Sequence, residues 1–148
     1  MSPPLRTEDD RNALVQGLVD ETIDVIVSDH KPEDEENKRL TFAQAETGAS
    51  GIETLLPLSL ELYHNGSVKL ETIIKALTSS PAKILKINKG NLSIGNDADF
   101  CIVDINKPWV VRKEKLISKS KNTPIEDKKL QGKVMNTFVN GEELFKAE

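Results

Sequence analysis

Ile23-Asp24-Val25-Ile26-Val27-Ser28-Asp29-His30 is the stretch of sequence that decides the fold. Its first five residues are apolar at four positions and mostly β-branched, which is typical of a strand buried on both faces of a parallel sheet. In parallel α/β architectures, the ligand-binding and catalytic groups gather at the carboxyl ends of the strands. Ser28, Asp29 and His30 follow the predicted strand directly, so we expect the chemistry of the protein at this place.

The residues before this stretch predict a helix. Thr7 fits an N-cap with Asp10 three residues later, as in a capping box, and a run of acidic residues suits the positive end of a helix. Apolar residues then recur with helical spacing, so we expect a helix over about residues 8–20. The order of helix, short connection and buried strand indicates an α/β fold.

The residues after the stretch predict a long loop and then helices. Residues 28–50 are polar and lack a clear period, which is typical of a functional or a disordered loop. Helices are expected over 52–63 and 70–77, the first of them ended by Asn65-Gly66. A third, short helix should open at Ser80-Pro81, with the serine as N-cap and the proline as the first helical residue.

Strand-like segments follow one another in the last part of the chain. They cover residues 100–104, 109–111, 134–139 and 143–145. Asn140-Gly141, between the last two segments, is a strong signal for a hairpin turn. Because these strands are few and short, we expect this small β unit to pair with strands outside this chain.

The composition excludes several classes of protein. The 148 residues carry a net charge of −4 with both signs interspersed, which removes the broad basic surface that nucleic acid or an anionic membrane needs. No apolar run approaches the roughly 20 residues of a membrane span, so we expect a cytoplasmic chain. One cysteine and two histidines permit neither a disulfide framework nor a His-rich metal centre within this chain.

Five features of the sequence are candidates for function. Asp29 can ligate a metal or act as a general base, although aspartate after a strand is also a common turn former. His30 is either a second functional group or a histidine that is hydrogen-bonded within the loop. The acidic run at 33–36 is typical of a solvated face. His64 suits a helix C-terminus, and Cys101, within an apolar strand, is expected in the core.

Five motifs, taken in order along the chain, share a family pattern. They are Ser2-Pro3-Pro4-Leu5-Arg6 with the 23–30 stretch, Gly51-Ile52-Glu53-Thr54-Leu55-Leu56-Pro57, Thr78-Ser79-Ser80-Pro81-Ala82, the segment 90–99, and Ser118-Lys119-Ser120-Lys121-Asn122-Thr123-Pro124. Together they resemble the dihydroorotases of the amidohydrolase superfamily over essentially the whole chain. The segment 90–99 is similar to the Gly-x-Leu-x-x-Gly-x-x-Ala-Asp signature with which many amidohydrolases return to a small β-sandwich.

The resemblance implies a fold. It implies that the chain is a C-terminal fragment of a TIM-type (β/α)8 metal-dependent hydrolase barrel, followed by part of a small β-sandwich. Residues 1–88 would end the barrel and residues 89–148 would supply sandwich strands. The family's early His-x-His, its carboxylated lysine and its two further histidines precede the region covered. The implied zinc site, with one or two ions, therefore takes its remaining ligands from outside this chain.

The resemblance also implies an activity, the reversible hydrolysis of the cyclic amide of dihydroorotate to N-carbamoylaspartate in pyrimidine biosynthesis. The family's aspartate that matches Asp29 ligates the more exposed metal, accepts the proton of the attacking hydroxide and returns it to the leaving amide nitrogen. Ser2 falls where many relatives bind substrate through an asparagine. Thr47-Gly48 falls where a Pro-Gly pair offers backbone groups to the substrate ring.

The loop after the predicted strand departs from the family pattern. Many relatives read Asp-His-Ala-Pro-His, and the second histidine contacts the substrate carboxylate, whereas this chain reads Asp29-His30-Lys31-Pro32-Glu33. Glu33 would repel that carboxylate, so either Lys31, His30 or another loop residue replaces the histidine, or substrate binding is impaired. Ser2 in place of asparagine keeps a hydrogen-bonding group with a shorter reach.

Two functions therefore compete. In the first, the chain is the C-terminal part of a dihydroorotase that acts only with the missing N-terminal barrel portion, supplied by a second polypeptide or by the same chain before cleavage or truncation. In the second, it is a noncatalytic remnant or a binding module. A related cyclic amidase of the hydantoinase or allantoinase type is a further alternative. We expect the isolated chain to be inactive. Its expected partners are a small-molecule substrate and the complementary barrel portion, and a homo-oligomer is a further option.

Overall fold

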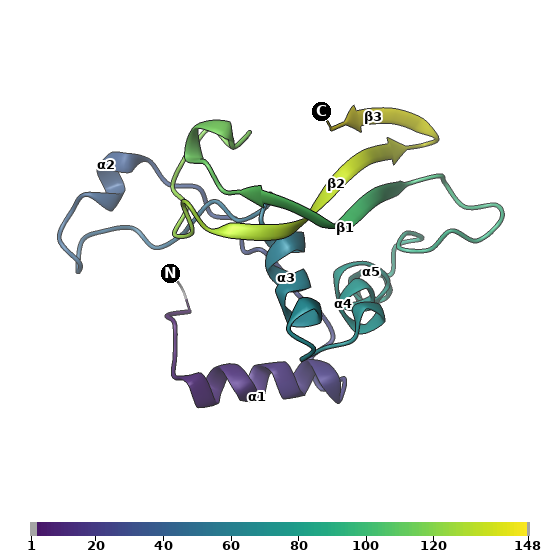
Figure 1. Cartoon of the computed structure of the whole chain (residues 1–148), viewed down its shortest axis with the longest axis horizontal. Coiled ribbons are helices and arrows are strands. Elements are labelled where there is room, and N and C mark those ends of the chain that lie inside the picture. Colours follow the sequence, from purple (N-terminus) through teal and green to yellow (C-terminus); the bar gives the residue numbers. More distant parts are fainter. Residues whose placement is uncertain (1–2, 148) are drawn as a thin grey trace.

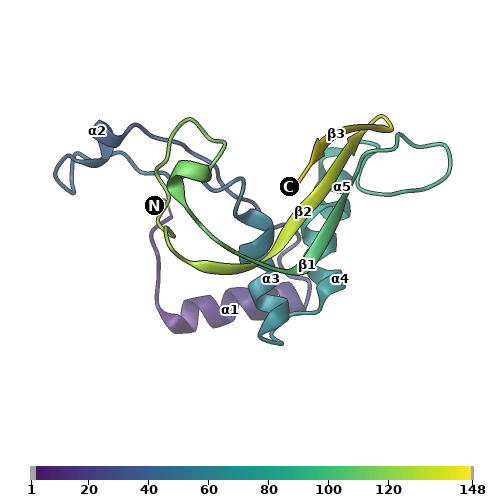
Figure 2. The same ribbon diagram turned by 45° about the horizontal axis from the view of Figure 1, so that its top comes forward.

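The computed structural model describes residues 3–147, in which the helices precede the strands (Figure 1). The helices are α1 (Glu8–Val19), α2 (Glu35–Lys38), α3 (Leu55–His64), α4 (Leu70–Leu77) and α5 (Ser79–Leu85), and the strands are β1 (Phe100–Val110), β2 (Lys129–Val139) and β3 (Glu142–Lys146), with a 3-10 turn at Lys113–Lys115. In Figures 1 and 2, α3 lies beneath β1 and β2, and α1 lies on the side away from the sheet. No helix within residues 3–147 is long and apolar enough to cross a membrane.

The N-terminal helix α1 begins as the sequence predicts. The side chain of Thr7 accepts the N–H of Asp10 at 3.3 Å, and the carboxylate of Asp10 accepts the N–H of Thr7 at 3.1 Å. This reciprocal pair is a capping box, and the acidic first turn lies at the positive end of the helix dipole. Leu18 is the residue that α1 buries, and the N–H of Ile23 bonds to Gly17 O at 2.8 Å just after the helix ends.

The predicted buried strand at 23–27 is wrong for this chain. These residues form no strand, and the side chain of Val27 is 71% exposed. A strand requires the hydrogen-bond ladder of a neighbouring strand, and the described residues place none beside this segment. Its backbone bonds to two helices instead: the N–H of Ile23 bonds to Gly17 O of α1 at 2.8 Å, and the N–H of Ile26 bonds to Ala76 O of α4 at 3.1 Å.

Helix α4 has its predicted bounds, and α3 begins three residues later than predicted, at Leu55. Pro57 lies in the first turn of α3, where its missing N–H costs no helical hydrogen bond, and Asn65 caps the C-terminus. Helix α5 begins two residues earlier than predicted. Its N-cap is Thr78 and its first residue is Ser79, so the predicted N-cap at Ser80 is wrong. The hydroxyl of Thr78 donates to Ile74 O of α4 at 2.6 Å, which ties the two helices together.

The three strands form one antiparallel sheet in the order β1-β2-β3. The predicted segments 100–104 and 109–111 are joined into the single strand β1, which carries a register shift between Asp104 and Pro108. The predicted hairpin turn at Asn140-Gly141 is confirmed, and both residues have positive φ (51° and 82°), as a tight two-residue turn requires.

The core lies where α3 packs on the sheet. Val111, Leu116 and Leu130 form a buried cluster with Leu58, Trp109 and Ile125 packed around it, and Leu60 of α3 is fully buried. The expected burial of Cys101 is wrong, since this residue is exposed on β1. Its sulfur lies 3.6 Å from the hydroxyl of Thr137 on the neighbouring strand, and the described residues place no second layer over it.

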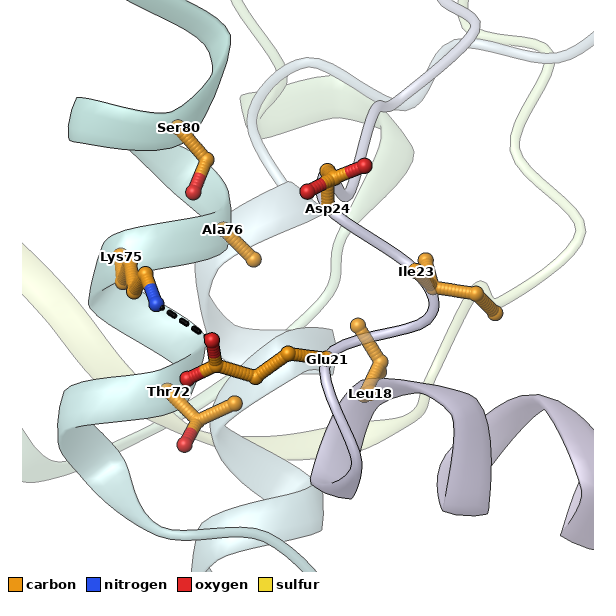
Figure 3. Close-up of a pocket in the computed structure, with 8 residues that line it drawn as sticks. All are labelled: Leu18, Glu21, Ile23, Asp24, Thr72, Lys75, Ala76 and Ser80. Atoms are coloured by element: carbon orange, nitrogen blue, oxygen red, sulfur yellow. Dashed lines mark hydrogen bonds and ion pairs between the residues drawn. The ribbon is translucent and has the colours of Figure 1, made fainter. Parts of the chain in front are cut away.

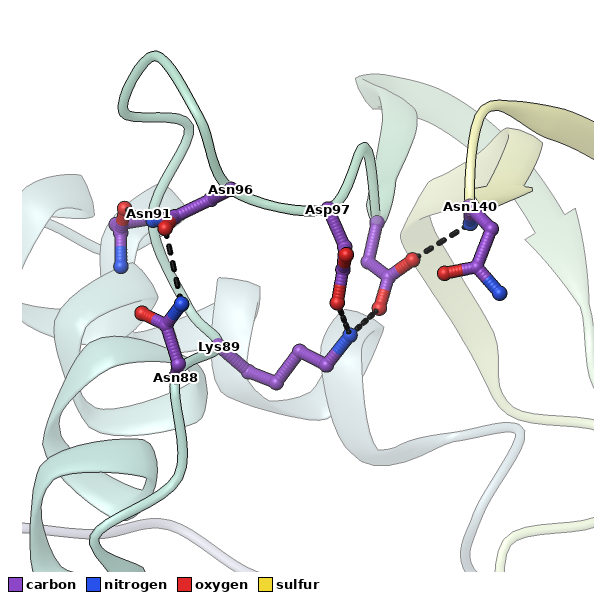
Figure 4. A network of polar contacts seen from close by, with 7 residues as sticks. Asn88, Lys89, Asn91, Asn96, Asp97 and Asn140 are labelled. Carbon is purple, nitrogen blue, oxygen red and sulfur yellow. Dashed lines mark hydrogen bonds and ion pairs between the residues drawn. The ribbon is translucent and has the colours of Figure 1, made fainter.

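A polar network joins the segment before β1 to the β2-β3 hairpin (Figure 4). Lys89 pairs with Asp97 at 2.7 Å and with Asp99 at 2.5 Å, and the carboxylate of Asp99 accepts the N–H of Asn140 at 2.7 Å. The N–H of Gly141 also donates to Ala98 O at 3.1 Å. The Ala-Asp pair that ends the 90–99 motif therefore holds the hairpin turn in place.

Candidate functional site

Asp29 lies at the end of the 23–27 segment, with its backbone in the left-handed region (φ 42°). Aspartate is among the few residues other than glycine that adopt this conformation readily. The residue is exposed, so its carboxylate is accessible to solvent. The structure thus places the predicted reactive carboxylate at a residue with left-handed backbone, where the chain enters the long loop.

His30 is held against the segment that leads into α3. Its Nδ1 accepts the N–H of Gly51 at 3.1 Å and the N–H of Ile52 at 3.3 Å. Because Nδ1 accepts two backbone hydrogen bonds, the proton of the neutral ring lies on Nε2. His30 therefore presents an Nε2–H donor, and its contact with a substrate stays a prediction.

Lys31 lies between two carboxylates. Its Nζ is 3.2 Å from Glu33 Oε1 and 3.7 Å from Glu46 Oε2, and the hydrogen bond with Glu33 is the main cause that raises the pKa of Lys31. The side chain of Glu33 is only 15% exposed, whereas that of Lys31 is half exposed. One ammonium group is thus shared by two carboxylates, which leaves this cluster with a net charge of −1.

The backbone at Thr47-Gly48 runs beside residues 28–33. Gly48 has φ 135°, and a Cβ at this position would lie 2.5 Å from Lys31 O, so glycine is required here. The N–H of Lys31 bonds to Ala49 O at 3.1 Å, and Nζ of Lys38 donates to Gly48 O at 3.1 Å. Thr47 itself is exposed. We call residues 28–33 and 46–51 the two arms of the loop.

The structure therefore brings together six of the seven predicted site residues, along two adjacent arms. They are Asp29, His30, Lys31, Glu33, Thr47 and Gly48. The seventh, Ser2, lies outside the described residues. Residues that sequence reasoning did not assign to the site also contact the arms: Ser118, Ser120 and Asn122, with Glu53 behind them. In the sequence, the two serines and the asparagine are marked only by the Ser-x-Ser-x-Asn pattern, which does not show what they contact.

A metal site is not complete within the described residues. Across residues 3–147, no three histidine, cysteine, aspartate or glutamate side chains lie close enough together to hold an ion. A catalytic zinc site commonly takes three protein ligands. The described residues therefore do not fit a zinc ion without ligands from elsewhere.

A shallow pocket lies at the other end of the 23–27 segment (Figure 3). Leu18, Ile23 and Ala76 supply its apolar wall, and Lys75 pairs with Glu21 at 2.8 Å across its mouth. None of the six predicted site residues that the structure describes lines it, and it shares no lining residue with the two arms.

Comparison with known proteins finds sequence relatives along the whole chain. A model of the amidohydrolase family matches residues 2–144. The chain is 45% identical to a dihydroorotase of Ehrlichia chaffeensis over 100% of its length, 44% identical to one of Anaplasma phagocytophilum over 100%, and 43% identical to one of a Wolbachia species from Drosophila simulans over 98%. It spans about a third (33%) of the length of each of these relatives.

Solved structures of similar shape confirm the predicted fold class. The chain superposes on an L-hydantoinase (dihydropyrimidinase) from Arthrobacter aurescens with a TM-score of 0.92 and 30% identity, covering 99% of this chain and 34% of that one. It also superposes on a D-hydantoinase with a TM-score of 0.89 and 22% identity, covering 99% and 33%. The second likeness concerns the fold alone.

Proposed function

Because the chain belongs to the amidohydrolase family, we propose that it forms the C-terminal part of a dihydroorotase. Such an enzyme hydrolyses the cyclic amide of dihydroorotate reversibly to N-carbamoylaspartate. One observation carries the proposal: proteins named dihydroorotase are 40–45% identical over nearly all of this chain, whereas the hydantoinase structures are 30% identical or less.

Asp29 is the proposed proton carrier of this reaction. A water oxygen adds to the carbonyl carbon of the ring amide, and the Asp29 carboxylate accepts the proton that the water loses. The same proton passes to the ring nitrogen as the carbon–nitrogen bond breaks, which leaves a carbamoyl NH2 group and a carboxylic acid. The carboxylic acid then releases the second proton of the water to solvent and becomes a carboxylate. The exposed position of Asp29, at the turn into the loop, supports this role.

Zinc is the metal that we propose for the assembled enzyme. The described residues do not fit it alone, so Asp29 would contribute one ligand and the complementary barrel portion the remainder. The isolated chain would then lack activity, and its main partner would be that barrel portion. A cytoplasmic location and further self-association belong to the same proposal.

The substrate carboxylate is proposed to bind His30 rather than Lys31. Lys31 is already shared by Glu33 and Glu46, and the net charge of −1 on this cluster disfavours another carboxylate beside it. The Nε2–H of His30 is a neutral donor that the backbone N–H groups of residues 51 and 52 hold in one orientation.

A related cyclic amidase is the second candidate. The close superposition on the L-hydantoinase (dihydropyrimidinase) structure favours it, as does Glu33, which replaces the histidine of the dihydroorotase pattern. A noncatalytic binding module is the third candidate. Turnover of dihydroorotate, dihydropyrimidine and hydantoin by the chain assembled with a complementary barrel portion separates these candidates. Preference for dihydroorotate supports the proposal, and preference for hydantoin or no turnover in a folded assembly contradicts it.

A further inference from the structure

Residues 116–122, which we call the clamp segment, connect the 3-10 turn to the loop before β2 and are fixed firmly at their first end. Leu116 is buried in the core cluster with Val111 and Leu130. The carboxylate of Glu53 accepts the N–H of Ile117 at 2.9 Å and the N–H of Ser118 at 3.1 Å. The start of the clamp segment is therefore held by both the core and the segment that leads into α3.

The rest of the clamp segment reaches both arms of the loop. The hydroxyl of Ser120 donates to Glu33 O at 2.6 Å on the first arm, and Nδ2 of Asn122 donates to Gly48 O at 3.1 Å on the second. Ser50 of the second arm is buried and bonds back to the clamp segment. Its N–H donates to Asn122 O at 2.7 Å, and its hydroxyl donates to Ser120 O at 2.9 Å. Each arm thus accepts a side-chain hydrogen bond from the clamp segment.

Apart from these bonds, the arms are held by polar contacts with each other: the N–H of Lys31 bonds to Ala49 O at 3.1 Å, and Nδ1 of His30 accepts the N–H of Gly51 at 3.1 Å. No residue from 28 to 33 is buried, so apolar packing does not determine the course of the first arm. Backbone groups whose position depends on a few hydrogen bonds open locally more readily than core elements do. The side chains of Ser120 and Asn122, which donate to the two arms, therefore help to determine where the backbone of the predicted substrate-binding residues lies.

We propose that Ser120 and Asn122 are positioning residues for substrate binding: they hold the arms that carry Glu33 and Gly48 at a fixed separation. This inference deepens the proposed function and rests on it for the identity of the substrate. Neither side chain is assigned a contact with the substrate. Their effect passes through the backbone carbonyls of the two arms.

The first test measures amide hydrogen exchange in the 148-residue chain. Ser120→Ala and Asn122→Asp each remove one donor, so exchange at the Lys31 and Ser50 amides should become about two- to tenfold faster, as expected for the loss of one net hydrogen bond. Ser120→Thr retains the hydroxyl and should restore protection. Lys119→Ala, at the exposed position directly before Ser120, is the matched control and should match the unaltered chain.

Unchanged exchange in both arms would overturn the proposal, and so would an equal acceleration in α4 and β2, because that indicates a global loss of stability. The second test uses the chain assembled with a complementary barrel portion. Ser120→Ala and Asn122→Asp should raise KM for dihydroorotate several-fold with a smaller change in kcat, and an unaltered KM contradicts the positioning role. Absence of turnover in the unaltered assembly counts against the proposed function alone, since the exchange experiment decides positioning without it.

Discussion

Leu60 of α3 and Gly132 of β2 fit together because residue 132 has no side chain. A Cβ at this position would overlap Cδ1 of Leu60, which is fully buried, and the φ of Gly132 is +105°. Gly132 O also accepts the indole N–H of Trp109 at 3.0 Å. The contact between Leu60 and Gly132 attaches α3, the helix that follows the two arms, to the sheet.

Gly132→Ala should therefore destabilise the chain strongly. Overpacking against Leu60 is expected to cost about 1–3 kcal/mol, and the positive φ adds roughly 1 kcal/mol of backbone strain. Urea unfolding followed by the fluorescence of Trp109, the single tryptophan, measures the loss.

Gly66→Ala is the matched control for this change. Gly66 has φ +76°, but a Cβ there would meet nothing within 4 Å, so this variant carries the backbone strain without the overlap. Equal losses of stability in the two variants would show that the contact between Leu60 and Gly132 is not what attaches α3 to the sheet.

Acid should loosen the β2-β3 hairpin through Asp99. The hydrogen bond from the N–H of Asn140, and then Lys89, lower the pKa of Asp99 below its ordinary value of 3.8. A lowered pKa in the folded state gives stability that is present above the unfolded value and is lost as the pH falls through the folded value. The amide resonance of Asn140 should therefore change at a pH below 3.8.

Asp99→Asn should abolish this pH-dependent change at Asn140. Asp97→Asn is the control, because Asp97 pairs with Lys89 but accepts no hydrogen bond from Asn140. If the Asn140 resonance titrates in the same way in the Asp99 variant, a different carboxylate controls the hairpin.

Features that depend on neighbouring residues were predictable from the sequence. The capping box of α1 and the hairpin turn at Asn140-Gly141 are local, and both were found where expected. The predicted strand at 23–27 failed because apolar, β-branched composition indicates a tendency, whereas a ladder needs a partner strand. Cys101 was misplaced for a similar reason, since an apolar run does not show whether a second layer covers the sheet.

The candidate site was predictable in part for the same physical reason. Asp29 and His30 were identified because they follow an apolar run, and the structure brings them together with the arm around Gly48. The contacts of Ser120 with Glu33 and of Asn122 with Gly48 span 87 and 74 residues of sequence. A local sequence pattern does not reveal contacts between residues so far apart in the chain, so the contacts of Ser120 and Asn122 can be seen only in the folded structure.

Asp29→Asn should lower the rate of dihydroorotate hydrolysis in the assembled enzyme by about 10²–10⁴-fold, because the amide cannot carry the proton. Asp24→Asn removes the same charge from another exposed position at the start of the same segment and should leave the rate nearly unchanged. Near-normal turnover by the Asp29 variant would exclude its proposed role.

The central claim is that this chain supplies one side of an active site whose remainder lies on a complementary barrel portion. The most direct measurement is the hydrolysis of dihydroorotate with added zinc by the chain alone, by the complementary portion alone and by the two together. We predict turnover only in the mixture. Turnover by the chain alone, or none in a mixture shown to have assembled, would contradict the claim.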